Sequence, residues 1–345
     1  AVYRVVGELN EMILALEPYT DKARFMADIG VLVNAERVLQ PDVFNGGTFL
    51  TDSHVGLARM FGELKQSFDI VNEQMRLDQY KLLVLPDNLR MNDTLKAKLA
   101  DYLQNGGKIL ASGTAGLNQA QDGFVLPQWD FTFAGIDTSN ASYFHLVNND
   151  DPKVSDMDYC MYSKSGTLFE AKNVLATYVK AYFDRHWDGF HGYFYTPPER
   201  GTRYAAAAVN GAGTVCHISF EIFKAYNKAA PYADKALVKQ CLAILLPDPL
   251  LKTEGLPSTA RVTLTGCSEY VLLHTKVTFP EVRGKVDIIE DHVVQPAGAV
   301  VSVKGQFTGA CTLPDLQPVV IEAADGYTRV SLPEITGYKM IKLDR

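Results

Sequence analysis

The hydrophobic positions of the first segment repeat with the period of a helix. Apolar residues recur three and four positions apart over residues 2–16, which is typical of a helix with one apolar stripe. Pro18 follows, and because proline lacks the N–H that a helix interior needs, the helix is predicted to end there. Such a stripe needs an apolar partner surface. Its members are Val2, Val5, Val6, Leu9, Met12, Ile13 and Leu16.

The pattern then alternates between short apolar runs and amphipathic helices. In the first of these helices Ser53 is the predicted N-cap, and Val55 is among the residues expected to point inward. The second helix is predicted to begin at Asn92 or Asp93 and to end at Gly106. This order of elements predicts a parallel sheet covered on both faces. The strands are expected at 27–34, 68–74, 80–88 and 108–113, and the helices at 53–67 and 92–107.

The last two-fifths of the chain changes from mixed to all-β patterning. Asn210-Gly211 separates two strand-like runs and predicts a hairpin, and a helix follows at 233–247. From Arg261 onward short β-rich runs recur, with glycine and proline every 8–12 residues, as expected of a small β-sandwich. The predicted domains are a helix and linker at 1–25, an α/β domain at 26–250 and a sandwich at 251–345.

Composition narrows the classes of partner. The 345 residues carry a net charge of -7 without a basic cluster, which argues against nucleic acid as a partner. No run of 18 apolar residues appears, so no membrane span is predicted. Five dispersed cysteines, none in a CxxC pair, predict buried free thiols and a cytoplasmic location, with the periplasm as the alternative. Because the chain does not start with Met, we expect an excised or processed fragment.

The turn LASGTAGLNQ after the strand at 108–113 is the place where a hydrolase of this architecture would hold its nucleophile. Ser112 lacks the Gly-x-nucleophile-x-Gly spacing, and His217 is the only base that the sequence offers for it. A structural turn is therefore the favoured interpretation. No phosphate-binding glycine motif and no clustered metal ligands are present, so no cofactor is predicted. The acidic runs at 149–151 and at Asp156 and Asp158 are interpreted as solvated loops.

Residues 182–199 read YFDRHWDGFHGYFYTPPE and concentrate aromatic side chains. Tryptophan, tyrosine and arginine dominate the energetics of interfaces, so this segment is a candidate interface or sugar-rim surface. Two alternatives remain: core packing of its first aromatic residues, Tyr182 and Phe183, and of Phe190, or stacking of sugars on exposed rings. The candidate contact residues are Arg185, Trp187, His191 and Tyr193.

The run YKLLVLPDNLRMNDTLKAKLADYLQNGGKILASG at 80–113 resembles the β-galactosidase trimerisation domain of bacterial glycoside hydrolases. ADIGVLVNAE at 27–36 and RYAAAAVNGAGTVCHISFEIFKAYNKAA at 203–230 are similar to its opening strand and closing hairpin. The resemblance implies a class I glutamine-amidotransferase-like (flavodoxin-like) domain without the catalytic cysteine, followed by a small sandwich. The aromatic segment resembles that of an α-L-fucosidase-like branch, but departs from it at Gly189, His191 and Tyr193.

What the resemblance implies is a non-catalytic C-terminal region of a glycoside hydrolase. Such a region assembles subunits into trimers or dimers and shapes the rim of an active site whose paired carboxylates belong to a preceding barrel. That barrel is the expected partner, together with further copies of the chain and a carbohydrate. The alternatives are a stand-alone hydrolase or amidotransferase-like enzyme, in which Ser112 and His217 would act, and a carbohydrate-binding module that stacks sugars on Trp187 and Tyr193.

Overall fold

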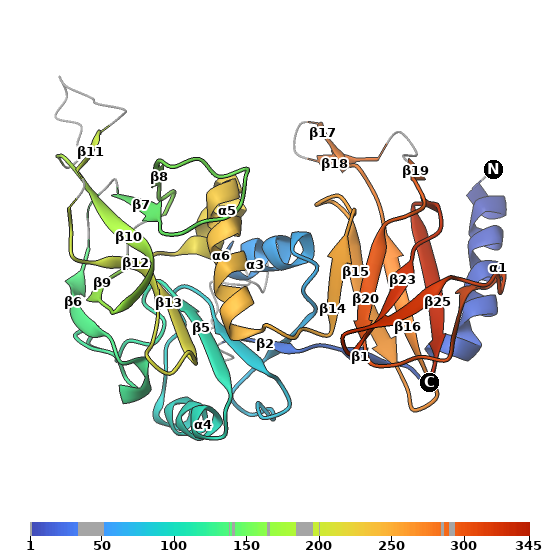
Figure 1. Ribbon diagram of the computed structural model, residues 1–345, viewed down its shortest axis with the longest axis horizontal. Helices are drawn as coiled ribbons and strands as arrows, with labels where there is room; N and C mark the ends of the chain where they lie inside the picture. The colour runs from blue at the N-terminus through green and yellow to red at the C-terminus, as the bar shows by residue number, and fades with distance from the viewer. Residues whose placement is uncertain are drawn as a thin grey trace. The chain divides into compact units, whose positions relative to one another are not determined.

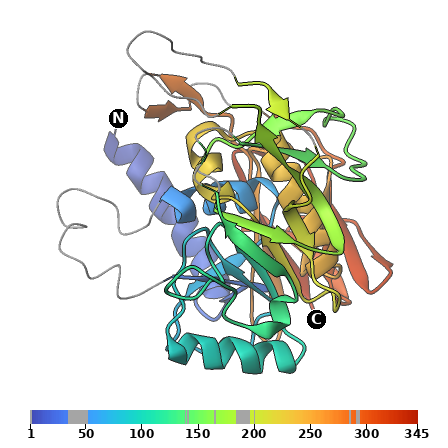
Figure 2. The same ribbon diagram turned by 90° about the vertical axis from the view of Figure 1, so that its left-hand side faces the viewer.

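The computed structural model divides the chain into two units (Figures 1 and 2). The α/β unit comprises Ile29–Met60 and Asp69–Pro247, and the β unit comprises Ala1–Asp28, Phe61–Phe68 and Asp248–Arg345. No helix in the described part of the chain is long and apolar enough to cross a membrane. The structure describes residues 2–33, 52–137, 139, 142–163, 166–183, 196–199, 201–283, 286–289 and 294–345.

A mixed sheet forms the centre of the α/β unit. Its strand order begins β3-β2-β4-β5-β13, and the pairs β2–β4, β4–β5 and β5–β13 are parallel, as the sequence predicts. The sheet then continues through the antiparallel strands β12, β10, β7 and β8. These strands are β2 (Ile29–Leu32), β3 (Phe68–Val71), β4 (Leu82–Leu85), β5 (Lys108–Ser112), β7 (Ser142–Leu146), β8 (Asp158–Cys160), β10 (Asn173–Ala181), β12 (Ala205–Val209) and β13 (Val215–Ile218).

Local sequence accounts for most of the helices and for the hairpin of this unit. Asn92 caps α4 by accepting a hydrogen bond from the N–H of Leu95, and Gly106 follows the helix with a φ of +88°. Asn210 closes the β12–β13 hairpin by accepting hydrogen bonds from the N–H groups of Thr214 and Val215. The helices are α3 (Asp52–Glu63), α4 (Asp93–Gln104), α5 (Ile222–Ala229) and α6 (Tyr232–Leu245); smaller elements are η2 (Pro127–Trp129), β6 (Thr132–Ile136), β9 (Thr167–Glu170) and β11 (Pro198–Glu199).

Two predictions for α3 are wrong. Ser53 lies inside the first helical turn and not at the cap, because the helix already includes Asp52. Val55 is exposed, while Leu57, Met60 and Phe61 are fully buried. The buried face of α3 is therefore narrower than its apolar positions suggest.

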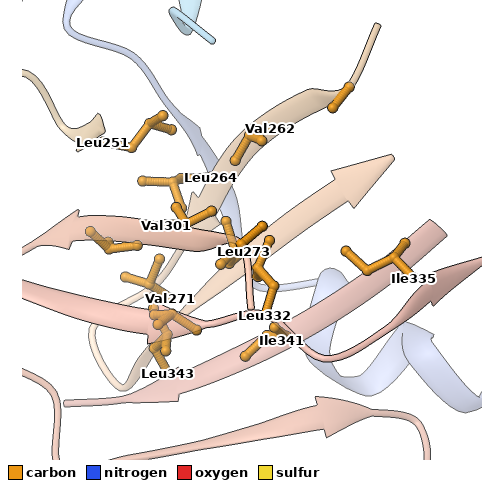
Figure 3. Packing of buried hydrophobic residues seen from close by; sticks show 14 of the residues in the cluster. Leu251, Val262, Leu264, Val271, Leu273, Val301, Leu332, Ile335, Ile341 and Leu343 are labelled. Carbon is orange, nitrogen blue, oxygen red and sulfur yellow. The ribbon is translucent and has the colours of Figure 1, made fainter. Parts of the chain in front are cut away.

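The β unit is a sandwich, as the pattern predicts. One sheet has the order β1-β15-β16-β25-β21 and the other β14-β20-β23-β22. Alternate residues of both sheets, such as Leu264, Leu273, Val301 and Ile341, meet in one core (Figure 3). The strands are β1 (Arg24–Met26), β14 (Leu251–Glu254), β15 (Arg261–Gly266), β16 (Tyr270–Lys276), β20 (Val300–Lys304), β21 (Gly309–Leu313), β22 (Ile321–Ala324), β23 (Tyr327–Ser331) and β25 (Tyr338–Asp344); β17 (Glu281–Arg283) pairs with β18 (Val286–Ile288), and β19 (Val294–Gln295) with β24 (Ile335–Thr336).

Helix α1 (Val2–Thr20) does not end before Pro18, contrary to the prediction. Proline removes only one hydrogen bond there, and tertiary contacts hold the last turn. Leu16 is buried against the outer face of the five-stranded sheet beside Leu272 and Met340, and the Tyr270 hydroxyl donates a 2.8 Å hydrogen bond to the carbonyl of Tyr19. The other residues of the predicted apolar stripe are exposed.

Candidate functional site

The carboxyl ends of the parallel strands are the usual ligand-binding edge of such a sheet. Here Asp87 follows β4, Ser112 ends β5 and Ser219 follows β13. All three residues are fully buried. This edge is therefore a packed part of the interior and not an open cleft.

Ser112 is bound to an acid and not to a base. Its hydroxyl donates a 2.7 Å hydrogen bond to Oδ1 of Asp87 and accepts a 2.8 Å hydrogen bond from the backbone N–H of Asp87. Both the proton and a lone pair of the hydroxyl are thus engaged. A serine nucleophile needs a histidine or another base within hydrogen-bond reach, and Asp87 is already committed to other donors.

Asp87 caps helix α5. Its carboxylate accepts hydrogen bonds from the backbone N–H groups of Lys224 at 2.9 Å and Phe223 at 3.4 Å, at the positive end of the helix. Burial raises the pKa of Asp87 to about 6, although hydrogen bonds from Ser53, Ser112 and Lys224 favour the charged form. The residue holds α5 on the sheet edge, which is a structural role.

His217 and Ser112 lie on opposite faces of the sheet. In the parallel pair of β5 with β13, Ser112 is opposite Ile218, and His217 is opposite Ala111. Because side chains alternate between faces along a strand, His217 and Ser112 point away from each other. The pairing that the sequence offered for a hydrolase is therefore absent.

His217 belongs to an aromatic cluster. The rings of Phe124 and Phe169 lie with their centroids 5.2 Å from that of His217, both edge-on to it. Burial lowers the pKa of His217 to about 3, and the backbone of Gly113 opposes this shift only in part. A neutral imidazole fully enclosed by phenyl rings has no access to a substrate.

Backbone segments pass close to one another at the carboxyl ends of the parallel strands. Gly113 has a φ of +61°, and a Cβ there would lie 2.5 Å from the carbonyl oxygen of Asp87. A Cβ on Gly166 would lie 2.8 Å from the backbone of Gly113 and from the carbonyl oxygen of Ser219. The glycines of the SGTAGL turn thus allow main chains to touch, in agreement with the interpretation of a structural turn.

Asp234 is a buried acid that the sequence analysis missed. It lies in the first turn of α6, where an exposed acid would be ordinary, but its side chain is fully buried. Neither carboxylate oxygen has a hydrogen-bond partner among the described residues. Burial raises the pKa of Asp234 well above its ordinary value, and the charge of Asp87 raises it further.

The predicted contacts of the aromatic segment, Arg185, Trp187, His191 and Tyr193, lie outside the described residues, so their roles stay predictions. Both ends of the segment are described. Lys180 and Ala181 of β10 pair with Glu199 and Pro198 of β11, and the Tyr143 hydroxyl donates a hydrogen bond to the Thr196 carbonyl. Tyr182 is 68% exposed and Phe183 38% exposed, so neither is a core residue.

One of the acidic runs is not a solvated loop. The side chain of Asp158 is only 8% exposed, and its Oδ1 lies 3.1 Å from Nδ1 of His145. Asp156, whose side chain is 91% exposed, lies 3.2 Å from Nε2 of the same histidine. Among the described residues no group of three or more histidine, cysteine or acidic side chains has the arrangement of a metal site.

Comparison with known proteins agrees with this geometry. Residues 59–185 match the family model of the β-galactosidase trimerisation domain. The resemblance expected from the sequence is confirmed. A search of curated proteins finds no match.

Solved structures extend the similarity over the whole chain. An α-L-fucosidase isoenzyme 2 from Paenibacillus thiaminolyticus is 25% identical with a TM-score of 0.89, covering 99% of this chain. A catalytic mutant of a GH42 β-galactosidase from G. stearothermophilus is 13% identical with a TM-score of 0.61, and a cold-adapted β-galactosidase from Rahnella is 15% identical with a TM-score of 0.60. For these β-galactosidases the likeness shows the fold alone.

The chain spans about half the length of the structures that it matches, 52% of the α-L-fucosidase and 44% of the two β-galactosidases. It therefore resembles one part of a glycoside hydrolase, and this part fits a non-catalytic accessory region.

Proposed function

We propose that this chain is the non-catalytic part of a glycoside hydrolase that joins subunits and shapes the rim of an active site held by a catalytic barrel. The uncovered stripe of α1 is the observation that carries this proposal. Only Leu16 of this helix is buried, whereas large apolar side chains along the rest of α1 are 40–93% exposed. They are Val2, Tyr3, Val5, Val6, Leu9, Met12, Ile13 and Leu14.

Exposure of these apolar side chains to water is energetically unfavourable. Burying one large apolar side chain contributes about 1.5–3 kcal/mol, so a partner that covers the stripe would gain a large stabilisation. A contiguous apolar surface of this kind marks an interaction site. We assign it to the catalytic barrel, because this chain matches 52% of the α-L-fucosidase and the rest of that enzyme lies outside the match.

Self-association is proposed from the α/β unit. The matched residues 59–185 lie within it except for Phe61–Phe68, and the family that they match is described as a trimerisation domain. The strand order also supports a flavodoxin-like, glutamine-amidotransferase-like class for this unit. Numbered among themselves in chain order, the five strands β2, β3, β4, β5 and β13 lie side by side as 2-1-3-4-5, although β7, β8, β10 and β12 come between β5 and β13 in the chain.

The rim role is proposed for residues 182–199. Arg185, Trp187, His191 and Tyr193 remain its predicted contacts with a neighbouring subunit or with a sugar. The pairing of β10 with β11, which brings the two ends of the segment together, supports this proposal.

Light scattering of the purified chain, combined with an assay on aryl glycosides, tests the proposal. A mass of two or three chains without hydrolysis is expected. A monomer at all concentrations would contradict the assembly role, and turnover would contradict the non-catalytic role. A Trp187→Ala variant that assembles as well as the parent chain would remove Trp187 from the interface.

A further inference from the structure

A groove of about 520 Å³ lies in the α/β unit, separate from the sealed carboxyl edge. The loop that follows β7 forms one wall, and the first three turns of α6 form the other. Its volume falls within the range of about 300–1,000 Å³ that is usual for small-molecule sites. Polar side chains that line it include Asn148, Asn149, Asp150, Tyr232, Lys239 and Gln240.

Asp151 joins the two walls. Its carboxylate accepts a 2.9 Å hydrogen bond from the Tyr232 hydroxyl and a 3.0 Å hydrogen bond from the backbone N–H of Lys153. Lys239 of α6 places Nζ 3.9 Å from the same carboxylate. Burial raises the pKa of Asp151, but these hydrogen bonds and nearby lysines outweigh it, and the pKa is lowered. Asp151 therefore stays charged and keeps the loop on α6.

Tyr232 does not offer a free ring face to a ligand. Lys153 and Lys235 place their ammonium groups 5.8 Å and 5.3 Å from its centroid. Its hydroxyl is bound to Asp151. A ligand that binds by stacking an aromatic ring is therefore not favoured.

The charges that line the groove balance. Asp150 and Asp151 face Lys153 and Lys239, so a ligand with a net charge of either sign would gain little. Uncharged polar groups complete the lining: two asparagine amides and the amide of Gln240. Carboxylates only accept, ammonium groups only donate, and amides do both.

We propose that this groove binds a neutral polyhydroxylated molecule the size of a mono- or disaccharide. Hydroxyl groups both donate and accept, so neighbouring hydroxyls match a lining that contains carboxylate, ammonium and amide groups. The proposal does not depend on the assembly role. Because the groove is open and polar, we expect a dissociation constant on the order of 1 mM.

Saturation-transfer NMR on the full 345-residue chain tests this proposal with lactose and sucrose as probes. The test variant is Asp150→Ala with Lys239→Met, which removes one acceptor and one donor of the groove and keeps the net charge. The matched control is Asp101→Ala with Lys96→Met, two exposed residues of α4 away from the groove. Equal thermal midpoints of the three proteins would show that each is folded.

We expect transfer to at least one sugar with the parent chain and the control, and at least tenfold weaker binding with the test variant. Equal binding by test variant and control would overturn the assignment of the groove. Isothermal titration calorimetry measures binding of inorganic phosphate and of Ca²⁺, which carry no C–H protons for saturation transfer. Binding of either in place of both sugars would overturn the ligand class, and no binding of any probe would overturn the site itself.

Discussion

The hydroxyl of Ser112 donates a 2.7 Å hydrogen bond to the buried carboxylate of Asp87, and that carboxylate caps helix α5. The contact joins the ends of β5 and β4 to the helix that follows β13. Its two partners occupy the edge where enzymes of this architecture hold their reactive groups. In this protein the same position stabilises the fold.

Ser112→Ala is expected to lower the free energy of unfolding of the α/β unit by about 1–3 kcal/mol, because it leaves a buried carboxylate without one donor. The chain has two tryptophans, Trp129 and Trp187, and both belong to the α/β unit, so urea unfolding followed by tryptophan fluorescence reports on that unit. Ser155→Ala, at an exposed position, is the matched control. A Ser112→Ala protein as stable as this control would mean that the hydrogen bond contributes nothing.

Asp234→Asn is expected to stabilise the α/β unit at pH 8 relative to the parent chain by about 1–3 kcal/mol, because the variant folds without taking up a proton or burying a charge at this position. The folded-state pKa of Asp234 is raised, so its protonated form favours folding. Its contribution is complete below the unfolded-state pKa of about 4 and is lost as the pH rises through the folded-state pKa. The advantage of the variant should therefore grow with pH.

Urea titrations from pH 5 to 8 measure that trend for Asp234. Asp101→Asn, on the exposed side of α4, is the control and should follow the parent chain at every pH. A constant difference between Asp234→Asn and the parent chain would contradict the raised pKa of the carboxyl group.

The parent chain is expected to lose stability at acidic pH because of His217, and the His217→Leu variant should not show this loss. Burial lowers the pKa of His217 to about 3, so its neutral form favours folding. This contribution is present above the unfolded-state pKa of about 6.5 and is lost as the pH falls toward 3, by about 2 kcal/mol at pH 5. The parent chain should lose this amount relative to the variant between pH 8 and pH 5.

The difference at pH 8 reports the packing change alone, because His217 is neutral there in both the folded and the unfolded state. If the two proteins kept a constant difference down to pH 5, the histidine would not be buried in the neutral form. Tryptophan fluorescence is again the readout, since Trp129 stacks on Phe124 beside the same cluster.

Substitutions along α1 should affect stability strongly at its buried side chain and weakly at its exposed ones. Leu16→Ser is expected to destabilise the β unit by about 2 kcal/mol or more, because Leu16 is buried against the sheet. Leu9→Ser and Ile13→Ser should leave the thermal midpoint within about one degree, since both are about half exposed. Circular dichroism measures the midpoints. Equal losses at all three positions would show that the stripe is covered in the isolated chain.

Local patterns in the sequence determined most elements of both units. The Asn92 cap, the Gly106 terminus and the Asn210-Gly211 hairpin depend on neighbours within a few residues, and they are found as predicted. The all-β tail also follows its alternation, because one face of each strand enters the shared core. The prediction of buried thiols holds for Cys216 and Cys241 but is wrong for Cys160, Cys267 and Cys311, which are partly exposed.

Tertiary structure alone decided which side chains meet. The sequence places Ser112 and His217 near the ends of strands, but only the register between β5 and β13 puts them on opposite faces. Asp234 looks like an ordinary acid of a first helical turn until packing buries it. Pro18 ends no helix, because contacts between Tyr19 and Tyr270 hold the turn around it. Such outcomes depend on residues far apart in the chain, whose approach no local pattern encodes.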